Sequence, residues 1–235
     1  MRPGFSGFSP EALTFFRGLA RNNNRDWFLP RKPAYEQHIK LPMRQFVEAL
    51  NGELQKFAPE YVTDPEKAVF RIYRDTRFSK DKTPYKTHIA ASFRRRGLGP
   101  HTSGGLYVQV SHQGVGMGGG AYMPEPLLLY GIRQHIAEHY EELRAILKDR
   151  KVRKFFGELQ GEQLVRVPKG FLNTHPAADL LRRKSLFLYS ELPTEVATTP
   201  KLFQEVVERF RVMKPFMDFL TAPQRKAPAR LRDVW

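Results

Sequence analysis

The sequence has no cysteine, comparatively few acidic residues and no long apolar run. The absence of cysteine excludes disulfides, thiolate nucleophiles and cysteine-ligated zinc, and it fits a reducing compartment. No stretch approaches the roughly 18 consecutive apolar residues that a membrane helix needs, and the opening residues lack the apolar segment of a secretory signal. We therefore expect a cytoplasmic protein without a membrane partner.

Acidic side chains are too few to balance the basic ones. The chain has 39 Lys and Arg against 24 Asp and Glu, which gives a formal net charge of +15. Residues 71–96 hold nine of the basic residues and only two acids, so this segment alone has a net charge of +7, nine minus two. A charge of this size bears on partners rather than on fold. It predicts an anionic, phosphate-bearing ligand and favours nucleic acid or a nucleotide.

The pattern of apolar residues changes along the chain. Apolar residues recur with helical spacing near both ends, whereas they alternate with a period of two in the middle. We predict an α+β fold in which a mainly antiparallel central sheet is covered by N-terminal and C-terminal helices. Residues 1–222 should form a single globular domain, since 235 residues with 41% hydrophobic content can fill one core, and residues 223–235 a basic tail. The expected helices span about 10–21, 33–57 and 126–149, with a last one from Thr199, and the expected strands are 68–74, 86–93, 105–111, 114–122, 163–168 and 185–192.

One stretch, Arg71 to Lys86 (RIYRDTRFSKDKTPYK), places six cationic and two acidic side chains within sixteen residues. Its turn residues predict a bend between two strands, so that the second half returns beside the first. Its arginines are interleaved with Ile72, Tyr73 and Phe78, and we expect them to lie partly out of water. Because buried charges need partners and two aspartates cannot neutralise six cations, the stretch predicts a missing anion.

The roles of individual residues in this stretch follow from side-chain chemistry. Asp75 lies between Arg74 and Arg77, where it can accept a guanidinium fork and fix the direction of an arginine. The alternative is a structural module, a solvated hairpin with internal ion pairs only, and such pairs individually stabilise little. The predicted ligand-binding residues are Arg71, Arg74, Asp75, Arg77, Lys82, Tyr85 and Lys86.

The same stretch resembles the signature of a bacterial family known only as domain of unknown function 2461. The residues that carry the resemblance are Arg71, Arg74, Asp75, Arg77, Phe78, Asp81, Lys82 and Tyr85. The segments NNNRDWF, YMPEPLLLYGIR and NTHP also resemble that family, so the similarity extends over most of the chain. It implies a single-domain cytoplasmic protein with a shared polar site, and it supplies no activity.

A competing hypothesis is an enzyme that acts on a small anionic substrate such as a phosphoester. His175, which precedes Pro176, is then the best general acid or base, and Tyr85 is a second proton carrier. A cleft that gathers Arg74, Lys82, Tyr85 and His175 would favour the enzyme. A basic strip that joins Arg77 to the three arginines at 94–96 would favour a nucleic-acid binder.

Two motifs match known cofactor patterns without the context that those patterns need. Gly114, Gly116 and Gly119 satisfy GxGxxG, but they lie in the predicted meander and no strand-helix-strand unit surrounds them. His135 and His139 match HxxEH, but their positions fit the flank and surface of an amphipathic helix. We therefore predict no metal and no cofactor.

Overall fold

The computed structural model describes residues 4–98 and 104–226. The chain divides into two compact units. Unit 1 consists of Met1–Phe93, Tyr107–Met117 and Glu191–Glu208, and unit 2 consists of Arg94–Leu106, Gly118–Ser190 and Arg209–Trp235. Among the described helices, none is long and apolar enough to cross a membrane.

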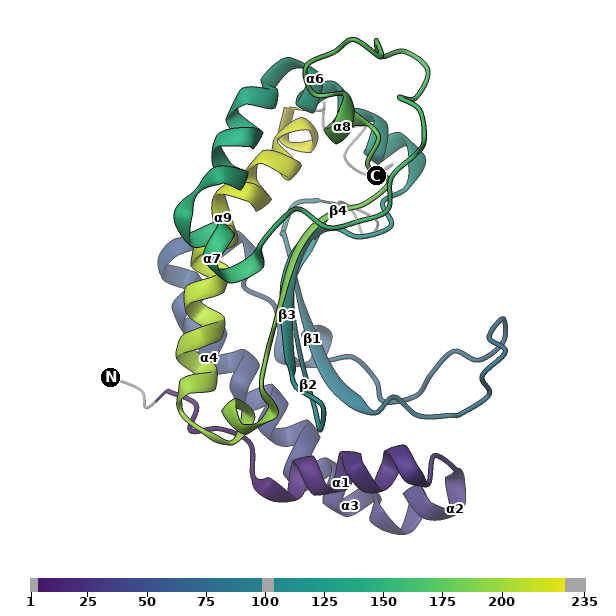
Figure 1. The fold of residues 1–235 in the computed structure, drawn as a ribbon. Helices are drawn as coiled ribbons and strands as arrows, with labels where there is room; N and C mark the ends of the chain where they lie inside the picture. The colour runs from purple at the N-terminus through teal and green to yellow at the C-terminus, as the bar shows by residue number, and fades with distance from the viewer. Residues whose placement is uncertain (1–3, 99–103, 227–235) are drawn as a thin grey trace. The chain divides into compact units, whose positions relative to one another are not determined.

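Four strands form one antiparallel sheet in the order β1-β2-β3-β4 (Figure 1). Helices from both ends of the chain flank the sheet, so the predicted α+β class and the antiparallel sheet are confirmed. The strands are β1 (His88–Arg94), β2 (Gly105–Ser111), β3 (Val115–Ala121) and β4 (Leu186–Leu192).

Unit 1 contains the N-terminal helices and the start of the last helix. A π-helical segment ends at Lys40, and Pro42 then lies in the first turn of α4, where proline is tolerated. Phe46 on α4 contacts Phe203 at the start of α9, with ring centroids 6.4 Å apart. The elements of unit 1 besides strands are α1 (Pro10–Arg21), α2 (Arg25–Phe28), η1 (Leu29–Arg31), α3 (Lys32–Tyr35), η2 (Glu36–Lys40), α4 (Leu41–Phe57), η3 (Pro59–Tyr61), α5 (Pro65–Ala68), η4 (Thr194–Thr198) and the first part of α9 (Lys201–Lys226).

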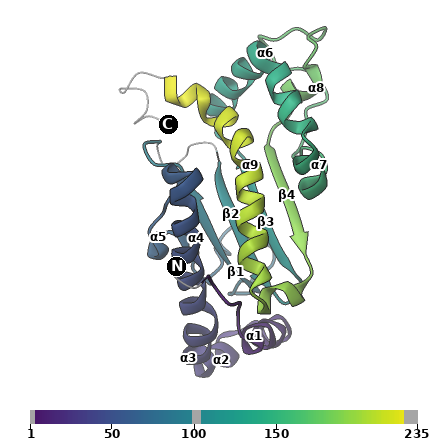
Figure 2. The same ribbon diagram turned by 90° about the vertical axis from the view of Figure 1, so that its left-hand side faces the viewer.

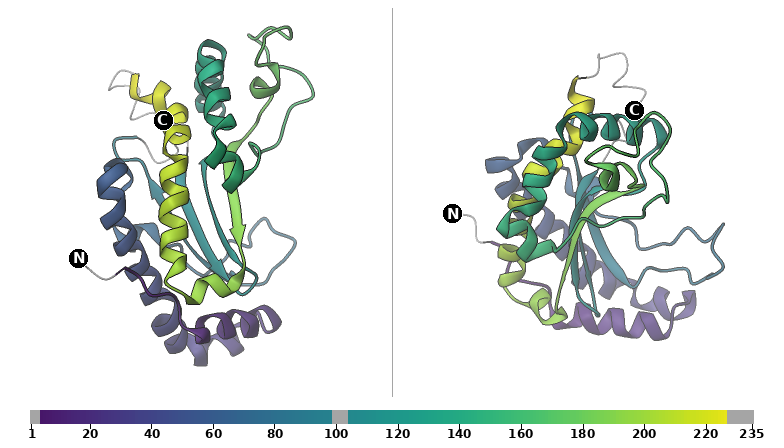
Figure 3. Two further views of the ribbon diagram at one scale, coloured as in Figure 1. Left: turned by 60° about the vertical axis from the view of Figure 1, so that its left-hand side comes forward. Right: turned by 45° about the horizontal axis from the view of Figure 1, so that its top comes forward.

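Unit 2 contains α6 (Pro126–Lys148), α7 (Arg150–Phe156), α8 (Ala178–Leu181) and the remainder of α9. The α6 helix packs against the later part of α9 (Figure 3) through His135 and Phe219, whose rings are 4.5 Å apart. The predicted tail from residue 223 begins inside α9, which ends at Lys226, and the rest of that tail lies outside the described residues.

Two predicted strands are wrong. Residues 163–168 form only an isolated bridge between Gln163 and Arg183, and Val165 is 91% exposed, so the alternating pattern there has no buried face. Residues 68–74 form two isolated bridges, between Val69 and Ala91 and between Tyr73 and Tyr85, rather than a continuous strand. The irregular pairing of residues 68–74, which lie in the candidate site, arises from a shift in register between the two bridges.

The glycines of β3 allow close packing. A Cβ at Gly118 would lie 2.5 Å from the Leu188 carbonyl oxygen, and one at Gly119 would lie 2.6 Å from the Met213 sulfur. Gly120 has φ of 140°, a conformation that favours glycine. These residues lie inside a strand and not between a strand and a helix, as a dinucleotide fingerprint requires.

We predict that Gly118→Ala destabilises the protein, because its new methyl group meets a backbone oxygen that cannot turn away. Overpacking of this kind lowers the free energy of unfolding by about 1–3 kcal/mol. Gly131→Ala on α6 is the matched control, because no atom lies within 4 Å of its added Cβ. It should raise that free energy by up to about 1 kcal/mol. Urea unfolding measures both, and a neutral Gly118→Ala would contradict the packing account.

Candidate functional site

The segment from Val69 to Ala91, here called the motif hairpin, consists of two irregularly paired arms. Three residues separate its two bridge positions on the first arm, 69 and 73, whereas five separate positions 85 and 91 on the second. The two extra residues bulge the second arm and shift the register by two. Backbone bonds on both sides of the bulge, from Phe70 N to Ala90 O and from Lys86 N to Ile72 O, keep the arms together.

The base of the hairpin is held by a side chain 62 residues away. Asn23 donates from Nδ2 to the Tyr85 carbonyl at 2.8 Å, and its Oδ1 accepts from the Tyr85 amide at 3.0 Å. The neighbouring Asn24 caps α2 by accepting from the Trp27 amide. The NNNRDWF segment therefore fixes one residue of the hairpin by both of its backbone groups.

Aromatic side chains fill the root of the hairpin. The buried ring of Tyr85 stacks on Phe28, with centroids 4.1 Å apart and planes 23° apart. Tyr73 contacts both rings from the side. Burial, assisted by the neighbouring Tyr73, raises the pKa of Tyr85, and Arg25 acts in the opposite direction. This geometry favours a packing role for Tyr85.

Arg74 connects the two arms near the root. Its Nη1 donates to the Asp81 carboxylate and to the hydroxyl and carbonyl oxygens of Thr83. Asp81 also accepts from the Thr83 amide at 2.9 Å. The amide of Thr83, followed by Arg74, lowers the pKa of Asp81 to about 2. Arg74 is thus a brace across the hairpin, and its carboxylate partner is Asp81.

Asp75 holds a different arginine. Its two carboxylate oxygens accept from Nε and Nη2 of Arg77 at 3.0 and 2.7 Å. These bonds, followed by one from the Arg77 amide, lower the pKa of Asp75 to about 2. The predicted guanidinium fork on Asp75 therefore exists, and it belongs to Arg77.

The expectation that all three arginines lie partly out of water is wrong. The Arg77 side chain is 77% exposed and Phe78 is 95% exposed, because the hairpin beyond the Arg74 brace reaches away from the rest of unit 1 (Figure 1). Among the three arginines, only Arg74 is half-buried, and Arg71 is exposed.

The lysines of the hairpin bond to backbone oxygens. Lys82 Nζ donates to the Thr76 carbonyl at 2.9 Å, and Lys86 Nζ donates to the Arg71 carbonyl at 3.1 Å. Burial, followed by the charge of Arg71, lowers the pKa of Lys86. Together with Arg71 and Lys80, these two lysines have no carboxylate partner in the part of the chain that the structure describes. Four of the six cations therefore have no ion-pair partner in the described chain, because the two aspartates pair with Arg74 and Arg77.

The structure places His175 in unit 2, whereas the motif hairpin belongs to unit 1. Its Nδ1 accepts from the Ala177 amide at 3.0 Å, and its ring contacts the edge of Tyr140. Arg144 holds this turn by bonding the Pro176 carbonyl at 2.9 Å and Asp179 at 2.8 Å. The contacts of His175 favour a structural role in the turn.

The HxxEH segment lies on α6. The rings of His135 and His139 are 4.5 Å apart, and His139 has non-helical backbone angles (φ −128°, ψ 30°) that kink the helix. In the described residues, no group of three His, Cys, Asp or Glu side chains could hold a metal ion.

The three arginines at 94–96 are not a uniform exposed patch. Arg95 is largely buried and donates to Asp218 at 3.3 Å, whereas Arg94 and Arg96 are exposed. Replacing all three would therefore break an ion pair in unit 2 as well as remove surface charge.

The two ion pairs of the hairpin can be tested separately by substitution. Arg74→Met should raise the pKa of Asp81 from about 2 part of the way toward 3.8, because the Thr83 amide remains, and leave Asp75 unchanged. Arg77→Met should raise the pKa of Asp75 toward 3.8 and leave Asp81 unchanged. Carbon-detected NMR titration of the carboxyl groups measures both.

The sign of the pH effect follows from these shifts. Because both folded pKa values lie below the ordinary 3.8, the pairs stabilise the hairpin above about pH 4 and lose that effect as the pH falls toward 2. A response of Asp75 to Arg74→Met, with Asp81 unmoved, would contradict the observed pairing.

The motif hairpin and the N-terminal segment that holds it both fall within the part of the chain that matches a known family. No curated protein and no solved structure matches the chain. The family model described as "Conserved hypothetical protein (DUF2461)" matches residues 11–219, which include every residue of the motif hairpin. The chain therefore belongs to the DUF2461 family, as its central motif indicates.

Proposed function

We propose that the motif hairpin binds a phosphate-bearing ligand, and that this ligand is nucleic acid or a nucleotide. The observation that supports the proposal is the set of cations without a carboxylate partner among the described residues: Arg71, Lys80, Lys82 and Lys86. Like charges crowded on one hairpin repel one another, so an anion that binds there gains attraction and also relieves repulsion. Phosphate oxygens accept several bonds from such groups at once.

The paired arginines have different roles in this proposal. Arg77 uses Nε and Nη2 for Asp75, so its Nη1 stays available for a phosphate while its direction is fixed. Arg74 donates through Nη1 to Asp81 and Thr83, and it mainly maintains the hairpin. In this proposal Tyr85 stabilises the root of the hairpin through its ring, and its hydroxyl does not contact the ligand.

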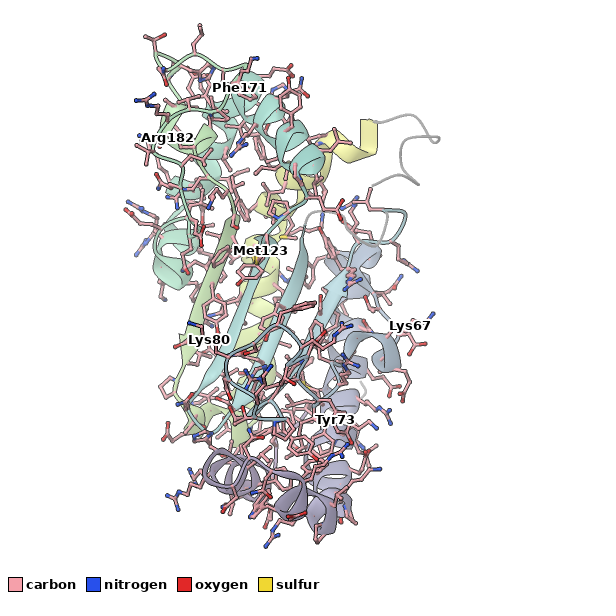
Figure 4. All side chains as sticks on the ribbon, turned by 90° about the vertical axis from the view of Figure 1, so that its right-hand side faces the viewer. Lys67, Tyr73, Lys80, Met123, Phe171 and Arg182 are labelled. Atoms are coloured by element: carbon pink, nitrogen blue, oxygen red, sulfur yellow. The ribbon has the colours of Figure 1, made fainter. Side chains whose placement is uncertain are left out.

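The exposure of the cations favours an extended ligand. Sites for small molecules are usually concave and enclose most of the ligand. Here Lys80 lies on the part of the hairpin far from Tyr73 (Figure 4), and the cations are distributed along both arms. A chain of phosphates can contact such a row, and the net charge of +15 would assist its approach.

The two other hypotheses have weaker support. The enzyme hypothesis relied on Tyr85 and His175, but the first is packed in an aromatic stack and the second accepts a backbone N–H in its own turn. A module with internal ion pairs only gives no role to the four of six cations that have no ion-pair partner in the described chain.

We predict salt-dependent binding that depends on the hairpin. For single-stranded nucleic acid, the logarithm of the association constant should fall with the logarithm of the salt concentration. The slope is about −0.7 per phosphate contacted, so four contacts give about −3. Arg71→Gln combined with Lys80→Gln removes two exposed cations whose side chains form no hydrogen bond or ion pair in the described part of the chain, and it should roughly halve that slope. Fluorescence anisotropy with a labelled 20-nucleotide oligothymidylate measures it.

The matched control removes two charges elsewhere in unit 1. Lys32→Gln with Lys67→Gln changes exposed lysines on α3 and α5. It should leave the slope nearly unchanged. Equal losses in the two double variants would mean that the total charge, and not the hairpin, determines binding, and undetectable binding at low salt would refute the proposal.

A further inference from the structure

The motif hairpin exposes aromatic rings as well as cations. Phe70 is 37% exposed, Tyr73 45% and Phe78 95%. Two rings packed at the root, Tyr85 of the hairpin and Phe28 of α2, are buried, so the exposure is not general in this region. Several exposed rings on one element that also carries exposed charges make this element a candidate binding surface.

Two of the exposed rings have a cation over one face. The Lys86 Nζ is 5.2 Å from the Phe70 ring centroid, and the Arg77 guanidinium carbon is 5.8 Å from that of Phe78. A ligand that reaches these places meets a flat apolar face and a positive charge together. Nucleotides match this arrangement, because each joins an aromatic base to a phosphate.

From this arrangement we infer that the exposed rings of the motif hairpin stack with unpaired bases, so that the hairpin selects single-stranded nucleic acid. The inference rests on the proposed phosphate-binding function and adds the class of ligand. Stacking on aromatic side chains tolerates any base sequence, since every base has a flat face. Binding should therefore be selective for strandedness and not for sequence.

The surroundings of the rings favour single strands over a duplex. The Tyr73 ring lies 5.5 Å from Tyr85 and 6.4 Å from Phe28, and the Phe70 ring lies 6.3 Å from Tyr107. A side chain that wedges between base pairs needs both faces free. Phe70 and Tyr73 each pack against another ring, so neither has both faces free. Phe78 is 95% exposed, so the duplex probe below tests whether this ring wedges between base pairs.

A second copy of the protein fits this surface poorly. The hairpin segment from Arg71 to Lys86 has six cations and two acids, a net charge of +4, and the chain as a whole has +15. Like charges on two facing copies would repel. The positive charge of this surface therefore favours an anionic partner over a second copy of the protein.

The test compares ligands that share a backbone and differ in their bases. Fluorescence anisotropy should use four probes: 20-nucleotide oligothymidylate, an abasic 20-mer, a 20-base-pair duplex, and inorganic polyphosphate as an unlabelled competitor. Oligothymidylate should bind at least about tenfold more tightly than the abasic strand, because stacking of a single base on an aromatic side chain can supply the about 1.4 kcal/mol to which tenfold corresponds. It should also bind more tightly than the duplex.

The variants locate the preference on the hairpin. Phe78→Leu keeps an apolar side chain without a π face, and its position in water makes folding insensitive to the change. It should weaken oligothymidylate binding by about tenfold and leave the abasic strand unaffected. Tyr122→Leu replaces an exposed ring in unit 2 and should change neither.

The outcomes separate the inference from the function on which it rests. Equal binding of oligothymidylate and the abasic strand would overturn the stacking inference and preserve phosphate binding. A duplex that binds as tightly as the single strand, with both weakened by Phe78→Leu, would identify an intercalating wedge and also overturn it. If no probe binds and polyphosphate does not compete, the proposed function itself fails.

Discussion

The shortage of carboxylates on the motif hairpin is the constraint that determines the properties of the site. Two carboxylates are available for six cations, and each is held by a different arginine. Asp81 with Arg74 stabilises the geometry of the arms, whereas Asp75 with Arg77 orients a donor in water. The remaining four cations form no ion pair in the part of the chain that the structure describes, so a ligand or dissolved counterions must balance their charge.

The hairpin divides into a held root and an exposed outer part. Asn23 binds both backbone groups of Tyr85, and the Phe28 ring stacks on Tyr85, so the root is anchored to the N-terminal helices of unit 1. On unit 1, α4 lies on one side of β1 and β2 (Figure 2), and the hairpin reaches out on the other (Figure 3). A rigid root lowers the entropy lost when the outer part binds, because fewer backbone angles remain to be fixed.

Local features of the site could be predicted from the sequence. The α+β class, the excess of cations at 71–86 and the return of the second arm depend on residues close to one another along the chain. The partner of Arg74 could not be predicted, because Asp75 and Asp81 are both near and the choice depends on how the arms pair. The bulge that prevents a regular strand at 68–74 arises from that same pairing.

Features that depend on contacts between distant parts of the chain could not be predicted from the sequence. Asn23 could be placed in a helix-breaking segment, but its bonds to Tyr85 join positions 62 residues apart. The glycines in and next to β3 match a cofactor pattern. Only the close approach of Leu188 and Met213 shows that these glycines allow tight packing. Partial burial of Arg77 was expected from its alternation with apolar residues, yet its side chain is 77% exposed, because the outer part of the hairpin extends away from the rest of unit 1.

The most direct measurement of the central claim is a map of amide chemical-shift changes when oligothymidylate is added to isotopically labelled protein. The account predicts changes concentrated in residues 70–86, with the signals of α6 in unit 2 unmoved. Changes that spare residues 70–86 and appear on another surface would contradict it.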